Sequence, residues 1–124
     1  MAKKKVLIVD DEPNIVTALE YLLARSGYDV AVAEDGEAAL AAVERERPDL
    51  VLLDIMMPRL NGYEVCRRLR ERPDGGAIKI VILSAKGRDV DVAKGLSLGA
   101  DLYVTKPFSS TELVARIAAL LGDR

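Results

Sequence analysis

Short apolar runs rich in valine, isoleucine and leucine recur along the chain and constrain its fold more than any other feature. They lie near residues 5–10, 29–33, 49–54, 79–84 and 101–105. Runs of this length and composition are typical of β-strands, and their spacing of about twenty to thirty residues leaves room for one helix after each strand. The pattern therefore predicts five strand-plus-helix units.

The segments between these runs change to the period of a helix. The first carries an apolar stripe that includes Ile15, Leu19 and Leu23 and ends at Gly27. Signals for helix starts are Pro13, Asp35-Gly36, Asn61-Gly62 and the capping-box pair Ser109 and Glu112. The fourth helix, around residues 89–98, has few apolar residues and an internal glycine, Gly95. We expect it to be the least stable helix and a candidate moving part.

The strand sequences also indicate how the sheet is built. The runs at 6–9, 50–53 and 80–83 are continuously apolar, which favours central strands of a parallel sheet covered on both faces. The runs at 29–33 and 101–105 are less apolar, and we place them toward the edges. Right-handed crossovers then give an α/β fold, a doubly wound five-stranded parallel sheet with the pattern (βα)5. No linker is evident, so residues 1–124 are predicted to form a single domain.

Composition and charge exclude several classes of function. The formal net charge of −2 argues against a broad basic face for nucleic acid. No run approaches the roughly 18 apolar residues of a membrane span, and four apolar residues after Lys3, Lys4 and Lys5 are too few for a signal peptide. One cysteine, Cys66, excludes an internal disulfide. We predict a cytoplasmic protein without direct contact to membrane or nucleic acid.

Polar side chains of complementary chemistry follow four of the five predicted strands. These residues are Asp10 and Asp11 after the first strand, Asp54 after the third, Ser84 after the fourth and Lys106 after the fifth. The carboxyl ends of parallel strands meet at one edge of a sheet, where ligands bind. We therefore expect three carboxylates, a hydroxyl and an ammonium group to converge on one pocket.

Their chemistry indicates a metal and a phosphoryl group. Three close carboxylates repel one another unless a cation lies between them, and an all-oxygen environment favours Mg²⁺. A carboxylate can also attack phosphorus and form an aspartyl phosphate, and Asp54 is the most central acid. Mg²⁺, Lys106 and Ser84 would then share the charge on the phosphoryl oxygens.

Each of these residues also has a simpler explanation when it is considered alone. Asp11 is well placed to cap the helix that begins at Pro13, and Asp54, Ser84 and Lys106 are residue types common in turns and on surfaces. Their joint occurrence at four strand ends favours a shared functional site.

With these residues in place, the sequence resembles the receiver domain of bacterial two-component response regulators over essentially its whole length. The matching segments are VLIVDDEP at 6–13, DLVLLDIMMPRLNGYEV at 49–65, ILSAK at 82–86 and GADLYVTKPFSSTEL at 99–113. The resemblance implies a flavodoxin-like fold in which Asp54 accepts a phosphoryl group from a sensor histidine kinase or phosphotransfer protein. It implies a signalling switch with autophosphorylation and autodephosphorylation activity only, and no enzyme acting on a metabolite.

The resemblance also assigns roles around the phosphoacceptor. It implies that the ligands of Mg²⁺ are Asp10 or Asp11, Asp54 and the backbone carbonyl of Met56. It implies that Lys106 contacts the phosphoryl group and that a cis peptide bond precedes Pro107. As side chains, Met56 and Met57 are interpreted as apolar residues that fill gaps.

Switching is assigned by the resemblance to Ser84 and Tyr103, with a hydroxyl that moves to the phosphoryl oxygen and a ring that fills the vacated space. The output surface would consist of the fourth helix, the fifth strand and the fifth helix, and would contact a downstream protein target. An alternative for Tyr103 is an ordinary residue of an edge strand.

The oligomeric state is left open between a monomer and a phosphorylation-dependent homodimer. In the subgroup of the family whose receivers drive winged-helix DNA-binding domains, dimers form through charge pairs, and Lys94, Asp101, Glu112 and Arg116 match part of that pattern. Leu102 replaces an acid that is usual there, so Arg116 is expected to lack its partner.

Lys86, two residues after Ser84, and Met56, two residues after Asp54, occupy positions that tune phosphoryl lifetime in the family. Our hypothesis is that these side chains shield the phosphoryl group from attacking water.

Three other functions fit the sequence less well than the signalling switch. A phosphohydrolase of the haloacid-dehalogenase type needs an acid two residues after the nucleophile, where this chain has Met56. A flavin carrier of the same fold needs a hydroxyl-rich first loop, and this one is acidic. A receiver used only for docking is disfavoured, because every group needed for phosphorylation is present. The last predicted helix stops at the end of the sequence, from which we expect output through protein–protein contact.

Overall fold

The computed structural model describes residues 3–57, 59–73 and 75–122. Within these ranges the chain alternates strands and helices from end to end. The elements are β1 (Lys5–Val9), α1 (Pro13–Arg25), β2 (Asp29–Ala33), α2 (Gly36–Glu46), β3 (Leu50–Leu53), α3 (Gly62–Glu71), the 3₁₀ turn η1 (Gly75–Ala77), β4 (Lys79–Ser84), α4 (Asp89–Ser97), β5 (Leu102–Thr105) and α5 (Ser110–Leu121). The strands agree with the predicted runs to within one residue at each end.

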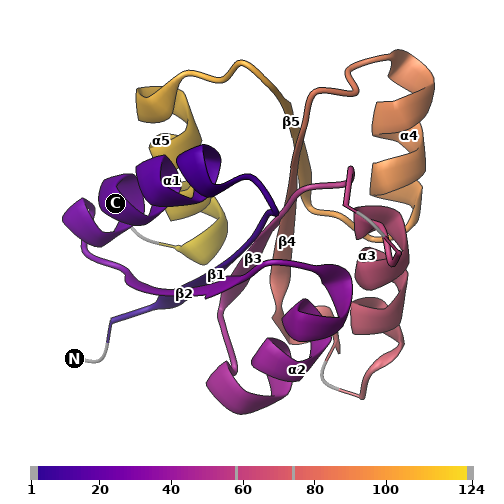
Figure 1. Cartoon of the computed structure of the whole chain (residues 1–124), viewed down its shortest axis with the longest axis horizontal. Helices are drawn as coiled ribbons and strands as arrows, with labels where there is room; N and C mark the ends of the chain where they lie inside the picture. The colour runs from indigo at the N-terminus through magenta and orange to yellow at the C-terminus, as the bar shows by residue number, and fades with distance from the viewer. Residues whose placement is uncertain (1–2, 58, 74, 123–124) are drawn as a thin grey trace.

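The strands form one parallel sheet in the order β2-β1-β3-β4-β5. The less apolar strands β2 and β5 lie at its edges, and the continuously apolar β1, β3 and β4 lie inside, as predicted. Helices α1 and α5 cover one face, and α2, α3 and α4 cover the other (Figure 1). This is the predicted doubly wound α/β fold.

Each face of the sheet carries its own hydrophobic core. Leu7 and Val9 of β1 belong to the core under α2 and α3, whereas Val6 and Ile8 belong to the core under α1 and α5. All four are fully buried. Strands that are buried on both sides cannot show the alternation of apolar and polar residues found in half-exposed strands, which explains their continuous apolar sequence.

The helix starts follow the predicted caps with one exception. Side chains of Asp35, Asn61 and Ser109 accept hydrogen bonds from backbone N–H groups three residues later, at 2.7, 3.1 and 3.2 Å. The alternative role of Asp11 as a helix cap is wrong, because Glu12 holds that position and makes no capping bond through its side chain. Pro13 supplies the fixed backbone angle at the first helical residue, so the carboxylate of Asp11 is not needed by the helix.

Gly95 has a packing role in α4. A β-carbon at this position would lie 2.8 Å from Cδ1 of Ile82 and 2.9 Å from Cδ2 of Tyr103. The glycine therefore allows the helix to approach β4 and β5 closely, which its helix propensity alone does not reveal. Whether α4 is the least stable helix stays a prediction.

Among the residues that the structure describes, none of the helices has the length and apolar character needed to span a lipid bilayer.

Candidate functional site at the carboxyl ends of the strands

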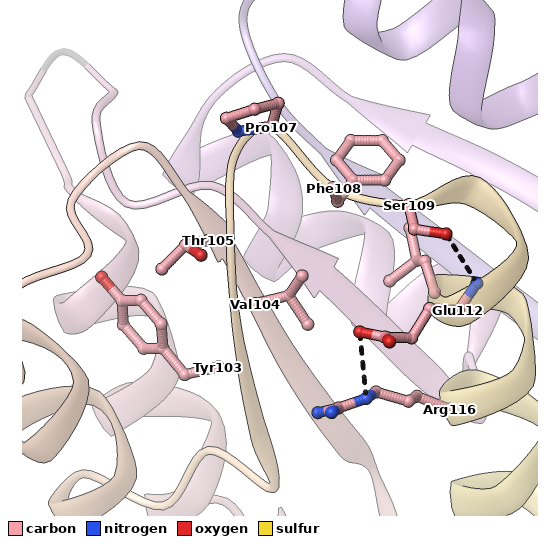
Figure 2. A pocket seen from close by; sticks show the side chains of 9 residues that line it. Tyr103, Val104, Thr105, Pro107, Phe108, Ser109, Glu112 and Arg116 are labelled. Atoms are coloured by element: carbon pink, nitrogen blue, oxygen red, sulfur yellow. Dashed lines mark hydrogen bonds and ion pairs between the residues drawn. The ribbon is translucent and has the colours of Figure 1, made fainter.

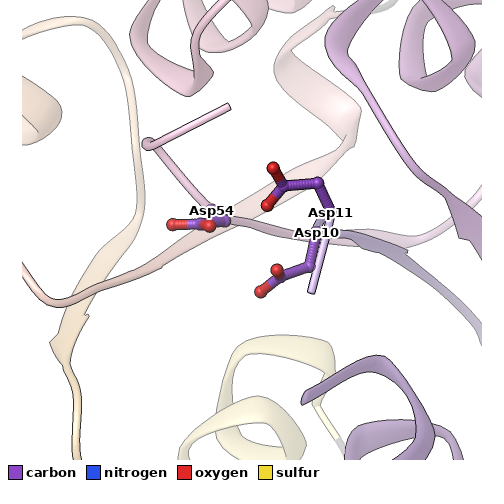
Figure 3. Close-up of side chains that lie close together, drawn as sticks. All are labelled: Asp10, Asp11 and Asp54. Carbon is purple, nitrogen blue, oxygen red and sulfur yellow. The ribbon is translucent and has the colours of Figure 1, made fainter. Parts of the chain in front are cut away.

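Three aspartates meet where β1 and β3 end. Asp10 and Asp11 follow β1 directly, and Asp54 follows β3 (Figure 3). One carboxylate oxygen from each residue lies within 4.8 Å of the others. Asp10 and Asp54 are buried and Asp11 is exposed, so the cluster opens to solvent on one side. The sheet therefore brings together the three acids that the sequence places on two separate strands.

Asp10 is held in a fixed orientation by two donors. Its Oδ1 accepts the backbone N–H of Glu12 at 2.9 Å, and its Oδ2 accepts Nζ of Lys106 at 3.3 Å. The first bond fixes the turn between β1 and α1, and the second joins β1 to the end of β5. A buried carboxylate needs such partners because water cannot reach it freely.

Asp54 is in a less favourable electrostatic environment. Its Oδ1 accepts the backbone N–H of Met56 at 3.3 Å, and Nζ of Lys106 lies 3.9 Å from its Oδ2. Burial and the neighbouring Asp10 carboxylate raise the pKa of Asp54, against a lowering effect from Lys106. The site therefore favours an added positive charge beside Asp54.

This donor set fits a small hard cation. The acids that converge here offer only oxygen atoms, and they leave the exposed side of the cluster open for water or a substrate oxygen. Mg²⁺ prefers oxygen ligands and keeps several waters, usually binding through one or two carboxylates plus a phosphate.

Ser84 and Tyr103 both form hydrogen bonds to the backbone of Lys86, in the loop that follows β4. Ser84 is fully buried, and its Oγ accepts the backbone N–H of Lys86 at 3.1 Å. The hydroxyl of Tyr103 donates to the carbonyl oxygen of Lys86 at 2.6 Å. The backbone N–H and carbonyl of Lys86, in the loop between β4 and α4, are therefore both bonded to side chains. These are the two side chains that the resemblance assigns to switching.

The remaining predictions near the site have mixed outcomes. The Lys106-Pro107 peptide bond is cis. Met57 is buried, as expected of a residue that fills a gap, but the side chain of Met56 is 56% exposed. The interpretation of Met56 as gap-filling is therefore wrong. It lies with Lys86 on the wall of an open pocket of about 390 Å³.

The charged residues of the suspected dimer pattern have partners within the chain. Asp101 accepts Arg70 Nη2 and the backbone N–H of Ile80, each at 2.8 Å. Arg116 pairs with Glu112 one helical turn earlier, at 3.8 Å. This internal pair does not test whether Arg116 has a partner in a dimer, so that expectation stays a prediction.

Arg116 and Glu112 line a pocket of about 250 Å³ between β5 and α5 (Figure 2). Leu102, one residue before Tyr103, packs against the core under α1 and α5.

Two residues at the start of α3 were missed as contributors to the site. The sequence indicates Gly62 only as part of a helix start, yet a β-carbon at this position would overlap the backbone carbonyl oxygen of Asp54. A glycine at the first helical position, where many residues form helix better, is the signal that could have indicated a close approach. Tyr63 carried no recognisable signal, because an aromatic residue in an amphipathic helix usually serves the core.

Comparisons with known proteins agree with this fold and site. The model of the response regulator receiver domain matches residues 6–118. The alkaline phosphatase synthesis transcriptional regulatory protein PhoP of Bacillus subtilis is 53% identical over 118 residues, which cover 95% of this chain and 48% of that protein. The chain thus spans about half the length of this curated relative.

Two solved structures are similar over nearly their whole length. The receiver domain of the sensor histidine kinase PA1611 from Pseudomonas aeruginosa PAO1, which has a magnesium ion coordinated in its active-site cleft, is 33% identical with a TM-score of 0.89, covering 98% of this chain and 100% of that one. The BeF3-activated receiver domain of RstA from Klebsiella pneumoniae is 36% identical with a TM-score of 0.89, covering 95% and 98%. Receiver domains pair with histidine kinases and output domains. Family model, relatives and fold agree, and this chain belongs to the response regulator receiver domains of two-component signalling systems.

Proposed function

We propose that this chain accepts a phosphoryl group on Asp54, in a Mg²⁺-dependent reaction, from a sensor histidine kinase or a phosphotransfer protein. The observation that carries the proposal is the buried carboxylate of Asp54, which lies between two further aspartates and the ammonium group of Lys106. In this proposal residues 1–124 act as one phosphoacceptor domain. The exchange takes place in the cytoplasm.

The proposed reaction needs little beyond positioning and charge. A carboxylate oxygen of Asp54 forms a bond to phosphorus while the bond from phosphorus to the donor breaks, and the donor group departs with that electron pair. Lys106, already within 3.9 Å of Asp54, stabilises the charge on the transferred oxygens. Asp10, Asp11, Asp54 and the backbone carbonyl of Met56 would hold Mg²⁺, which would supply further positive charge beside those oxygens.

The same geometry supports a switch at the β4–α4 loop. A phosphoryl group on Asp54 offers new acceptor oxygens, and the hydroxyl of Ser84 can leave the N–H of Lys86 to donate to one of them. Because the hydroxyl of Tyr103 donates to the carbonyl oxygen of Lys86, a movement of this loop would also change the position of Tyr103. The rearrangement changes the surface made by α4, β5 and α5.

We propose that this output surface binds a downstream protein target, because the net charge of −2 provides no broad basic face for nucleic acid. The chain acts as a monomer or as a phosphorylation-dependent homodimer. The internal partners of Asp101 and Arg116 favour the monomer before phosphorylation, since a dimer through these charges would first have to break existing pairs.

The proposal is tested by incubating the protein with Mg²⁺ and a small acyl phosphate and measuring its intact mass. We expect one phosphoryl adduct that requires Mg²⁺ and is absent from Asp54→Asn. Asp49→Asn is the matched control, because Asp49 is an exposed carboxylate at the opposite end of β3. Absence of an adduct from a wild-type protein that demonstrably binds Mg²⁺, both with the acyl phosphate and with a phosphorylated kinase, would contradict the proposal.

A second prediction concerns the lifetime of the phosphoryl group. Lys86 and Met56 line the same open pocket, together with Ile55. We propose that they limit the approach of water to a phosphoryl group on Asp54. We expect Lys86→Ala to hydrolyse its adduct several-fold faster than the wild type, measured as loss of the adduct mass after removal of the donor. Lys79→Ala changes a lysine at the far end of β4 and should leave the rate unchanged. Equal rates for Lys86→Ala and the wild type would contradict shielding.

A further inference from the structure

Tyr63 joins α3 to α4 at two points. It is the second residue of α3 and is 8% exposed. Its hydroxyl donates to the carbonyl oxygen of Asp91 in the first turn of α4, at 3.2 Å. The Nζ of Lys94, one turn further along α4, lies 4.4 Å from the centroid of its ring, which is the geometry of a cation–π contact. The two helices lie on the same face of the sheet, with α4 above α3 in the view (Figure 1).

The same side chain also meets the aromatic residue of the switch. Burial and the neighbouring phenol of Tyr103 raise the pKa of Tyr63 to about 12. The Tyr103 ring in turn lies on α4 at Gly95, where a β-carbon would come within 2.9 Å of it. Figure 2 shows Tyr103 directed away from the side of β5 that faces α5. Tyr63, Tyr103 and Gly95 thus form one packed unit between α3, β5 and α4.

Tyr63 is also connected to the backbone beside Asp54, through the residue that precedes it. The preceding residue, Gly62, donates its N–H to the carbonyl of Ile55 at 3.0 Å and lies so close to Asp54 that a β-carbon would overlap the Asp54 carbonyl oxygen. A shift of the backbone at Asp54 and Ile55 must therefore move the start of α3. Because Tyr63 follows directly, that movement reaches α4 through Asp91 and Lys94.

We propose that Tyr63 is a positioning residue of the switch, which transmits the state of Asp54 to α4 through the backbone of α3 and does not require Ser84. The inference rests on the function proposed above and adds a second connection to it. Two connections that act on one helix restrict it more strongly than either alone, because α4 can change position only when both contacts rearrange. The contacts of Tyr63 hold α4 in its present position before phosphorylation.

The test is amide hydrogen exchange over residues 89–97, with and without Mg²⁺ and beryllofluoride, which mimics the phosphoryl group. Tyr63→Phe removes the hydrogen bond to Asp91 and keeps the ring, and Lys94→Met removes the cation from the helix surface. Tyr21→Phe is the matched control, because Tyr21 is 66% exposed on α1. Before activation we expect exchange in α4 to be roughly fivefold faster in Tyr63→Phe, as the loss of one hydrogen bond implies. The change in exchange on activation should be reduced in both variants and unchanged in Tyr21→Phe.

The outcomes separate this inference from the proposed function. If the wild type forms an adduct and Tyr63→Phe shows the full wild-type change in α4, the inference is wrong and the proposed function stands. Exchange in α4 of Tyr63→Phe could also be faster by the same factor with and without beryllofluoride, so that the change on activation is preserved. That result would show that Tyr63 has only a structural role, and it would overturn the inference. Absence of the adduct from the wild type would overturn the proposed function and this inference together. Adduct formation by Tyr63→Phe, with a reduced response in α4, supports both.

Discussion

Replacing Asp54 with asparagine should make the protein more stable at pH 7 when Mg²⁺ is absent. Asp54 is buried beside two other carboxylates, and its charge is more costly in the folded protein than in the unfolded chain. Asparagine removes the charge and keeps nearly the same shape. Lys106 keeps Asp10 as a partner at 3.3 Å. We expect the free energy of unfolding to rise by on the order of 1 to 2 kcal/mol.

The dependence of this difference on pH follows from the direction of the pKa shift. The pKa of Asp54 is raised above its ordinary value of 3.8, so near that pH the folded protein holds a proton that the unfolded chain has already released. The stability of the wild type therefore falls as pH rises from about 3.8 through the raised pKa, and then levels off. The asparagine variant has no such transition, because its amide does not titrate. The advantage of Asp54→Asn should be small below the ordinary pKa and complete at pH 7.

Urea unfolding of both proteins at several pH values, with EDTA and with Mg²⁺, measures these free energies. At a Mg²⁺ concentration of 100 times its Kd, binding to the folded wild type adds about 2.7 kcal/mol, which offsets or reverses the order of stability. Asp49→Asn serves as a control for removing one exposed carboxylate. A wild type that is as stable as Asp54→Asn in EDTA at pH 7 would contradict this account of the cluster.

The sheet could be predicted from the sequence because strands that are buried on both faces have a continuously apolar sequence. Runs such as Val6–Val9 and Leu50–Leu53 are apolar without interruption only when both sides of a strand are covered. The strand order then brings Asp10, Asp54 and Lys106 to one edge. The proximity of these three residues could therefore be predicted from the sequence.

Contacts made by single side chains could not be predicted from the sequence in the same way. The pairing of Asp101 with Arg70 joins residues 31 positions apart, and no local pattern distinguishes it from a free surface charge. The same holds for Gly95, whose helix propensity indicates a weak helix, whereas the structure shows that Tyr103 and Ile82 occupy the space of a β-carbon. Packing between elements decides these cases, and propensity does not describe it.

Asp11 illustrates how two local rules compete. An aspartate two residues before a proline at a helix start is a reasonable capping residue. In the structure the chain reaches the helix one residue later, Glu12 occupies the cap, and the carboxylate of Asp11 is left for the acid cluster. A departure from local preference of this kind is expected at functional sites.

Gly62→Ala should impair phosphorylation severely, although it changes no ionisable or catalytic group. A β-carbon at residue 62 would overlap the carbonyl oxygen of Asp54 and lie 2.7 Å from Cα of Ile55. Both neighbours are backbone atoms, so the chain that carries the Asp54 carboxylate must move. Displacing a reacting group by about 1 Å can cost on the order of 100-fold in rate. We expect a loss of this order in the rate of adduct formation, together with weaker binding of Mg²⁺.

Two further glycines make this prediction specific. Gly76→Ala adds a β-carbon with no atom within 4 Å and should behave as the wild type. Gly36→Ala would press on the carbonyl oxygen of Leu60, at 2.6 Å, on the far side of the same loop, and should have a smaller effect because Leu60 is more distant from Asp54 in the chain. The rates are measured at a temperature where circular dichroism shows each variant folded. Equal rates of phosphorylation for Gly62→Ala and Gly76→Ala would contradict this prediction. They would mean that the loop between β3 and α3 can adjust without moving the Asp54 carboxylate, and that the close approach at Gly62 serves only to start α3.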